Sequence, residues 1–178
     1  MRMSQMMSGT DLFPEFSPSL TEITSTRTRG LLAYWQKKCA GRPMPSREDI
    51  DPGEIRELLP NIVMVDIEQP FRVRYRLVGT RVADFNRIDF TGRYLDELRW
   101  DGQGRYSRAY RYVCEQGVPI FGIDSWPLSH DHAGRSEIGI MPLSPDGKNV
   151  DRCLSIEDFL FPEHQLLRRD YLDTKSHT

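Results

Sequence analysis

Cysteine is scarce in this sequence: the 178 residues include only Cys39, Cys114 and Cys153. Their number is odd, they lie far apart in the sequence, and no two form a CxxC pair. The pattern therefore predicts neither a disulfide framework nor a thiolate zinc site. A chain with so few cysteines is typical of the reducing cytoplasm, and we expect it there.

Long apolar runs and net charge are also lacking. No stretch reaches the roughly 18 consecutive apolar residues that a membrane-spanning helix needs. The start, residues 1–9, lacks the apolar core of a secretory signal. With 24 Lys and Arg against 26 Asp and Glu, the formal net charge is -2. No overall basic field would attract nucleic acid or anionic lipid, so we expect neither as a partner.

The length fits one domain, since domains have roughly 100 to 200 residues. Residues 1–24 are rich in Ser, Thr, Met and Pro without a sustained period, which predicts a flexible leader. We expect a single domain over residues 25–160. Residues 161–178 would form a C-terminal helical turn and a tail.

Spacing indicates where the helices lie. Leu31, Leu32, Trp35 and Cys39 recur three to four residues apart after a cap-like cluster at residues 25–26, which predicts an amphipathic helix. Shorter helical patterns fill the region between residues 80 and 117, including a helix over residues 103–116.

Runs rich in β-branched and aromatic residues predict five strands, over residues 61–68, 71–80, 118–128, 136–144 and 150–158. Because the strands come in hairpin-sized groups, the order predicts an α+β fold with a five-stranded antiparallel sheet. Short helices would cover one face and the N-terminal amphipathic helix the other. In the second strand, Phe71, Val73, Tyr75 and Leu77 are expected on one face.

Several short motifs, in order, carry a resemblance to a known family. They are Leu32 and Trp35, Pro45-Ser-Arg47, Asp51-Pro52, Leu58-Leu59-Pro60, Tyr75-Arg-Leu-Val-Gly-Thr80, Asp89-Phe-Thr-Gly92, Met141-Pro-Leu143 and Asp146-Gly147. Over residues 30–158 the chain resembles the PAS domain superfamily, and specifically a bacterial family of single-PAS proteins formerly described as a domain of unknown function. The resemblance implies a sensory or protein-interaction domain, and it supplies no catalytic residues.

A PAS-type sheet would enclose a small apolar chamber for a small-molecule ligand. The candidate lining residues are Val73, Tyr75, Leu77, Phe85, Tyr106, Tyr110, Ile138 and Ile140. Large side chains could instead fill the space, which would make the protein a ligand-free structural adaptor. We expect the signal to pass to a separate signalling protein, and we expect a homodimer anchored by Leu31, Leu32 and Trp35.

The resemblance also bears on cofactors. Some PAS domains hold haem through a histidine of the helix before the third strand, and light sensors use a cysteine in an Asn-Cys-Arg context. The helix over residues 103–116 has no histidine, and residues 80–100 have no cysteine. We therefore expect no cofactor, neither haem nor flavin. Cys114 lies beside Glu115 without an adjacent base, and it is interpreted as a small apolar residue.

One cluster has metal-ligand residue types: His130, Asp131 and His132. Two histidines so close together could share an ion, which leaves a small metal-assisted enzyme as the alternative function. No third His or Cys ligand is nearby, and Gly134 gives the segment the composition of a turn. We therefore expect no metal and no enzymatic activity.

Overall fold

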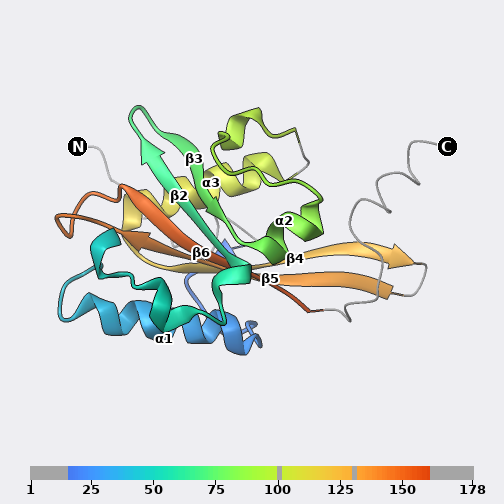
Figure 1. Cartoon of the computed structure of the whole chain (residues 1–178), viewed down its shortest axis with the longest axis horizontal. Coiled ribbons are helices and arrows are strands. Elements are labelled where there is room, and N and C mark those ends of the chain that lie inside the picture. Colours follow the sequence, from blue (N-terminus) through green and yellow to red (C-terminus); the bar gives the residue numbers. More distant parts are fainter. Residues whose placement is uncertain (1–15, 100–101, 130–131, 161–178) are drawn as a thin grey trace, which may run out of the picture.

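The computed structural model describes residues 16–99, 102–129 and 132–160, and it has a single antiparallel sheet at its centre (Figure 1). The strands follow one another across the sheet in the order β1-β4-β5-β6-β2-β3. They are β1 (Phe16–Ser17), β2 (Ile62–Glu68), β3 (Arg72–Val78), β4 (Ile120–Ser129), β5 (His132–Leu143) and β6 (Arg152–Phe159). The predicted α+β fold is confirmed, with β1 as one strand more than the five expected.

Helices cover both faces of the sheet. Figure 1 shows α1 on one side and α2 and α3 on the other; we call the side of α2 and α3 the inner face. The helices are α1 (Thr26–Cys39), α2 (Thr80–Asn86) and α3 (Gln103–Gln116), with short 3-10 helices η1 (Arg47–Asp49), η2 (Pro52–Ile55), η3 (Leu59–Asn61) and η4 (Leu95–Glu97). The predicted helix over residues 103–116 has these bounds in the structure.

Gly79 fixes the place where α2 begins. A Cβ atom there would collide with the backbone carbonyl oxygen of Pro60 in η3. The Gly79 N–H also donates a 2.7 Å hydrogen bond to the carbonyl oxygen of Ile62. Only glycine permits this close approach, which brings the start of α2 against the start of β2.

A bulge in β3 corrects one sequence prediction. The register shifts so that Val65 lies opposite Tyr75 but Met64 lies opposite Leu77, which leaves Arg76 as an extra residue in β3. A bulge reverses the alternation of faces beyond it. Val73 and Tyr75 are accordingly buried, whereas Leu77 is 42% exposed. The prediction that Leu77 shares their face was wrong, because simple alternation takes no account of an inserted residue.

The predicted flexible leader, residues 1–24, extends too far along the chain. Residues 16–24 were predicted to belong to a flexible segment, yet Phe16 and Ser17 pair with Phe121 and Gly122 at the edge of β4. The Phe16 ring is buried and meets Tyr106 edge to face, with 5.7 Å between ring centres. A two-residue strand is too short to produce a periodic signal, and only its tertiary neighbours reveal it.

Two buried carboxylates hold the segment before α1 on the outer face of the sheet. Glu137 of β5 accepts hydrogen bonds from the backbone N–H groups of Thr24 (2.8 Å) and Ser25 (2.7 Å), and from the Thr24 hydroxyl (2.8 Å). Asp158 of β6 accepts a 2.7 Å hydrogen bond from the Ser25 hydroxyl. We call Thr24, Ser25, Glu137 and Asp158 the carboxylate clasp.

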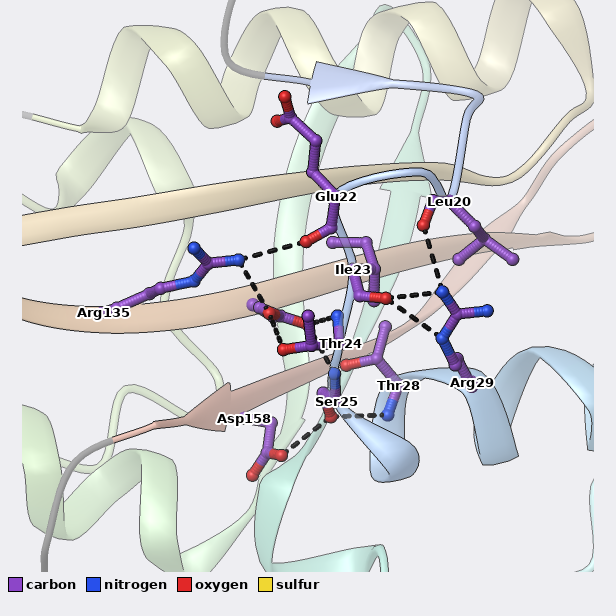
Figure 2. Close-up of polar contacts among 10 residues, drawn as sticks. Leu20, Glu22, Ile23, Thr24, Ser25, Thr28, Arg29, Arg135 and Asp158 are labelled. Atoms are coloured by element: carbon purple, nitrogen blue, oxygen red, sulfur yellow. Dashed lines mark hydrogen bonds and ion pairs between the residues drawn. The ribbon is translucent and has the colours of Figure 1, made fainter.

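Two arginines complete these contacts, and Figure 2 shows one of them, Arg135, beside the segment that precedes α1. Arg135 donates to Glu137 (2.9 Å) and to the carbonyl oxygen of Glu22 (3.0 Å). Arg27 pairs with Asp158 at 3.1 Å. The Ser25 oxygen also accepts from the Thr28 N–H at 3.0 Å and so caps α1. The start of α1 is therefore tied to β5 and β6 through charge-assisted hydrogen bonds.

These hydrogen bonds decide the protonation of Glu137. Burial by itself raises the pKa of this carboxyl, but the hydrogen bonds from Ser25, Thr24 and Arg135 outweigh burial, and the pKa of Glu137 lies below its ordinary value. The carboxylate is thus the form that the folded protein stabilises. A group with such a lowered pKa stabilises the fold above its unfolded pKa and loses that contribution as the pH falls through its folded pKa.

We expect Glu137→Gln to lower the free energy of unfolding by about 2 kcal/mol near neutral pH, because an amide offers only one acceptor to the donors that face it. The difference from the wild type should shrink as the pH falls through the lowered folded pKa of Glu137, because the wild-type carboxylate then becomes protonated. Urea denaturation at several pH values measures both effects. Glu57→Gln, at an exposed glutamate, is the matched control. Equal stability of Glu137→Gln and wild type, or a difference that ignores pH, would contradict this account.

Candidate functional site

The inner face of the sheet holds a cavity of about 370 Å³, bounded by the central strands together with α2, η4 and α3. Its wall consists mainly of aliphatic and aromatic side chains with a few polar ones. The lining residues are Val63, Tyr75, Val82, Phe85, Asn86, Ile88, Phe90, Arg93, Glu97, Leu98, Arg99, Tyr106, Tyr110, Ile138, Ser155, Ile156 and Glu157.

Aromatic contacts fix the shape of the wall. The rings of Tyr75 and Phe90 meet edge to face with 4.5 Å between centres, and those of Phe85 and Phe159 stack at 4.2 Å. Phe85 belongs to α2 and Phe159 to the end of β6, so this stack holds α2 on the sheet. Such pairs are rigid, and they keep the wall in one arrangement.

A small set of polar groups lies within this apolar wall. The hydroxyls of Tyr110 and Ser155 are 3.4 Å apart, and the Ser136 hydroxyl donates a 3.0 Å hydrogen bond to Glu157. Burial raises the pKa of Tyr75 and of Tyr106 well above the ordinary value of a phenol. Their hydroxyls therefore stay neutral at physiological pH and can donate or accept a hydrogen bond from a ligand.

Charged side chains form the exposed part of the lining. Arg93, Glu97 and Arg99 are all solvent-exposed and all border the cavity. The site thus combines an apolar interior with two guanidinium groups and one carboxylate where it meets solvent. A molecule with an apolar body and one polar or anionic end fits this distribution.

The structure brings together some of the predicted pocket residues and separates others. Tyr75, Phe85, Tyr106, Tyr110 and Ile138 line the cavity. Val73 and Ile140 are buried in the core but do not line the cavity, and Leu77 lies beyond the bulge.

Other lining residues escaped the sequence analysis. They come from β2, α2, the segment that follows α2, η4 and β6, and include Val63, Val82, Asn86, Ile88 and Ile156. The first predicted strand has apolar residues on both faces, and this pattern indicated that Val63 would be buried. Asn86 and Ile88 gave none, because their role depends on how α2 packs.

The predicted dimer anchors lie inside their own chain. Leu31, Leu32 and Trp35 are buried against the outer face of the sheet, with exposures of 0%, 9% and 6%. The Trp35 indole N–H donates a 2.7 Å hydrogen bond to the carbonyl oxygen of Pro142 in β5. These side chains stabilise the monomer's core, and a homodimer would have to use other residues.

The predicted metal-ligand cluster is not tested by the structure. His130 and Asp131 lie outside the described residues, and of His132 only its backbone, at the start of β5, is described. Within the described part of the chain, no three His, Cys, Asp or Glu side chains gather as a metal site would require. Helices long and apolar enough to cross a membrane are likewise absent from the described ranges.

The structure is an α+β domain with helices on both faces of one antiparallel sheet and a cavity on its inner face, and a family comparison identifies it. The PAS domain family model matches residues 23–156. The chain therefore belongs to the PAS domain family, as its sequence motifs predicted. No curated protein sequence matches it.

Several solved structures are similar to the chain. A light-oxygen-voltage domain described with a flavin analogue has a TM-score of 0.46 and 12% identity, over 70% of this chain and 93% of its own. An RNA-binding light-oxygen-voltage receptor has a TM-score of 0.43 and 15% identity, over 71% and 36%. The PAS domain of Bordetella pertussis BvgS has a TM-score of 0.40 and 16% identity, over 71% and 94%.

These matches correct the prediction about flavin. The sequence excluded flavin because it lacks an Asn-Cys-Arg motif, but structures similar to this chain include light-oxygen-voltage domains, one of them described with a flavin analogue. The exclusion was wrong because a motif for one cysteine's photochemistry does not decide which molecules a cavity admits. The expectations about haem and about nucleic acid stay predictions.

We expect Leu31→Asp to unfold the protein, and not to dissociate a folded dimer, because a carboxylate at this fully buried position would lose its hydration without gaining a partner. The expected loss is about 3 kcal/mol or more in the free energy of unfolding. Urea denaturation measures it, with sedimentation to follow the oligomeric state. Ala33→Asp, on the exposed side of the same helix, is the control and should change stability little. A folded, fully stable Leu31→Asp protein would contradict the burial of α1.

Proposed function

We propose that this PAS domain is a sensor that binds a small, mainly apolar molecule in the cavity on the inner face of its sheet. One observation carries the proposal: a cavity of about 370 Å³ lined by Tyr75, Phe85, Tyr106, Tyr110 and Ile138. Ligand sites in proteins occupy about 300 to 1,000 Å³, so this cavity would take a molecule at the small end of that range.

The chemistry of the wall supports an apolar ligand with a polar end. Burial of apolar ligand surface supplies about 25 cal/mol per Å², and this term would dominate affinity here. The neutral tyrosine hydroxyls and Ser155 would orient the ligand through hydrogen bonds. Arg93 and Arg99 favour a ligand whose exposed end is anionic.

Strands β5 and β6 offer a path by which the bound molecule would be sensed. Ile138 lines the cavity, and its neighbour Glu137 holds Thr24 and Ser25 on the outer face. In β6, Glu157 lines the cavity, and its neighbour Asp158 accepts a hydrogen bond from the Ser25 hydroxyl on the outer face. A ligand that displaces either strand would therefore strain the carboxylate clasp at the start of α1. We propose that α1 and the residues before it pass this change to a separate signalling protein.

A sensor accounts for this lining better than an enzyme does. The wall is mostly aromatic and aliphatic, and both of its carboxylates are already engaged, Glu157 by Ser136 and Glu97 by Arg72. A ligand-free adaptor is the remaining alternative, in which the cavity has no occupant and the domain acts only through its surface.

The proposal is tested by filling the cavity. Anilinonaphthalene sulfonate, an apolar dye with one anionic group, should bind the wild type saturably with a rise in fluorescence. We expect Ile138→Trp to weaken binding at least about tenfold, which corresponds to roughly 1.4 kcal/mol, because the indole would occupy the dye's space. Val118→Trp, at an exposed position that does not line the cavity, adds the same ring and should bind as the wild type does.

The outcomes separate the alternatives. No saturable binding to the folded wild type would favour the adaptor. Equal binding by all three proteins would place the dye elsewhere and contradict the cavity as the ligand site. Circular dichroism of each variant shows whether it is folded.

A further inference from the structure

A second cavity, of about 350 Å³, lies on the outer face of the sheet, and we call it the outer cavity. It is bounded by β2, β3, β6 and the segment between α1 and β2, which Figure 1 shows on the same side of the sheet as α1. Three arginines border it, Arg47, Arg76 and Arg152, and the rest of its lining is apolar. It shares no lining residue with the cavity on the inner face.

The floor of the outer cavity belongs to the hydrophobic core. Ile62, Met64 and Leu154 come from the strands, and Ile50 and Ile55 face them from the segment after α1; all five are buried. A recess whose floor is apolar and already built suits the apolar body of a small molecule. Its volume lies at the small end of the range for ligand sites, about 300 to 1,000 Å³.

The bulge in β3 shapes one wall of the outer cavity. In a regular strand, successive residues point to opposite faces. At the bulge, two residues of β3 lie opposite one residue of β2, and both Arg76 and Leu77 border the outer cavity. Leu77 is 42% exposed, which leaves apolar surface that a ligand would cover. The bulge thus places a cation and an apolar side chain together at this site.

Positive charge exceeds negative charge around the outer cavity. Asp66 of β2 accepts a 2.8 Å hydrogen bond from Arg152, and its carboxylate lies 3.9 Å from the Arg76 Nε. Arg47 donates to the carbonyl oxygen of Ile50 at 3.1 Å, which orients its guanidinium. A guanidinium has five N–H donors, so these contacts leave most donors of the three arginines available to a ligand.

The acidic residues of η1 and η2 do not cancel this charge. Asp49 pairs with Arg42 and Glu54 pairs with Lys38, each at 2.7 Å. No acidic residue of these two short helices lines the outer cavity. An anionic group on a ligand therefore complements the three arginines, which only Asp66 offsets.

From this arrangement we infer that the outer cavity is a second ligand site, which binds a small organic anion with an apolar body, such as a medium-chain carboxylate. The chain of the ligand covers the apolar floor and Leu77. Its carboxylate accepts charge-assisted hydrogen bonds from Arg47 and Arg76. The site is separate from the inner cavity and does not depend on the function proposed above.

The outer cavity is connected to α1 through η2. The Asp51 N–H donates a 2.8 Å hydrogen bond to the Tyr34 hydroxyl of α1, and Glu54 pairs with Lys38 of the same helix. Pro52 and Ile55, which alternate with these contacts, line the outer cavity. If α1 transmits the signal, as proposed above, a ligand here acts on the end of α1 opposite the carboxylate clasp.

The test titrates decanoate into the folded, full-length, nitrogen-15-labelled protein and follows the backbone amides by two-dimensional NMR. We expect saturable shifts of the amides of Ile55, Arg76, Leu77 and Leu154. Decylammonium has the same chain with the opposite charge, and it should not shift these amides. Ile138→Trp, which fills the inner cavity, should leave the shifts at the outer cavity unchanged, so failure of the proposed function would leave the second site standing.

Two variants test the chemistry of the outer cavity. Leu77→Glu places a carboxylate beside the ligand and should weaken decanoate binding at least about tenfold. Its matched control is Leu160→Glu, the same change at a leucine that is 39% exposed and lines neither cavity. Arg76→Gln should weaken binding about threefold, since this arginine is exposed. Arg56→Gln, at an exposed arginine outside the lining, should bind as the wild type does.

Several results would overturn the inference. Absence of saturable shifts at the outer cavity of the wild type would do so, as would equal shifts with decylammonium or equal binding by Leu77→Glu and Leu160→Glu. Shifts of the same amides when the wild type is concentrated without decanoate would show that a second copy of the chain occupies the cavity instead. The wild-type titrations decide the question even if Leu77→Glu fails to fold.

Discussion

Strands β5 and β6 are buried on both faces, and the rest of the structure depends on this constraint. Successive residues of a strand point to opposite faces, so each strand supplies one set of side chains to the cavity and another to the side covered by α1. Ile138 and Glu137 are such neighbours, as are Glu157 and Asp158. The cavity and the carboxylate clasp are therefore two faces of the same pair of strands.

Two buried carboxylates are an expensive way to hold a helix, because each must leave water. Here that cost is offset by complete pairing. Glu137 accepts from two backbone N–H groups, a hydroxyl and a guanidinium, and Asp158 from a hydroxyl and a guanidinium. Directional pairing of this kind specifies one position for the start of α1, which apolar packing alone would define less sharply. The clasp thus sets the register between α1 and the sheet.

The inner side uses different physics. Rigid aromatic pairs and a few neutral hydroxyls shape the cavity, and α3 contributes Tyr110, whose hydroxyl lies 3.4 Å from that of Ser155. Helix α3 and strand β6 thus carry part of the cavity wall together.

The sequence by itself determined the elements whose signal is local and repeated: the helix through Leu31 and Trp35, the helix over residues 103–116, the five main strands and the PAS family membership. Only the tertiary structure decided features that depend on contacts between distant residues. The bulge at Arg76 turned Leu77 outward, β1 formed only because β4 offers an edge, and Leu31, Leu32 and Trp35 entered the core. Periodicity reports which face of an element is apolar, but packing alone determines what that face meets.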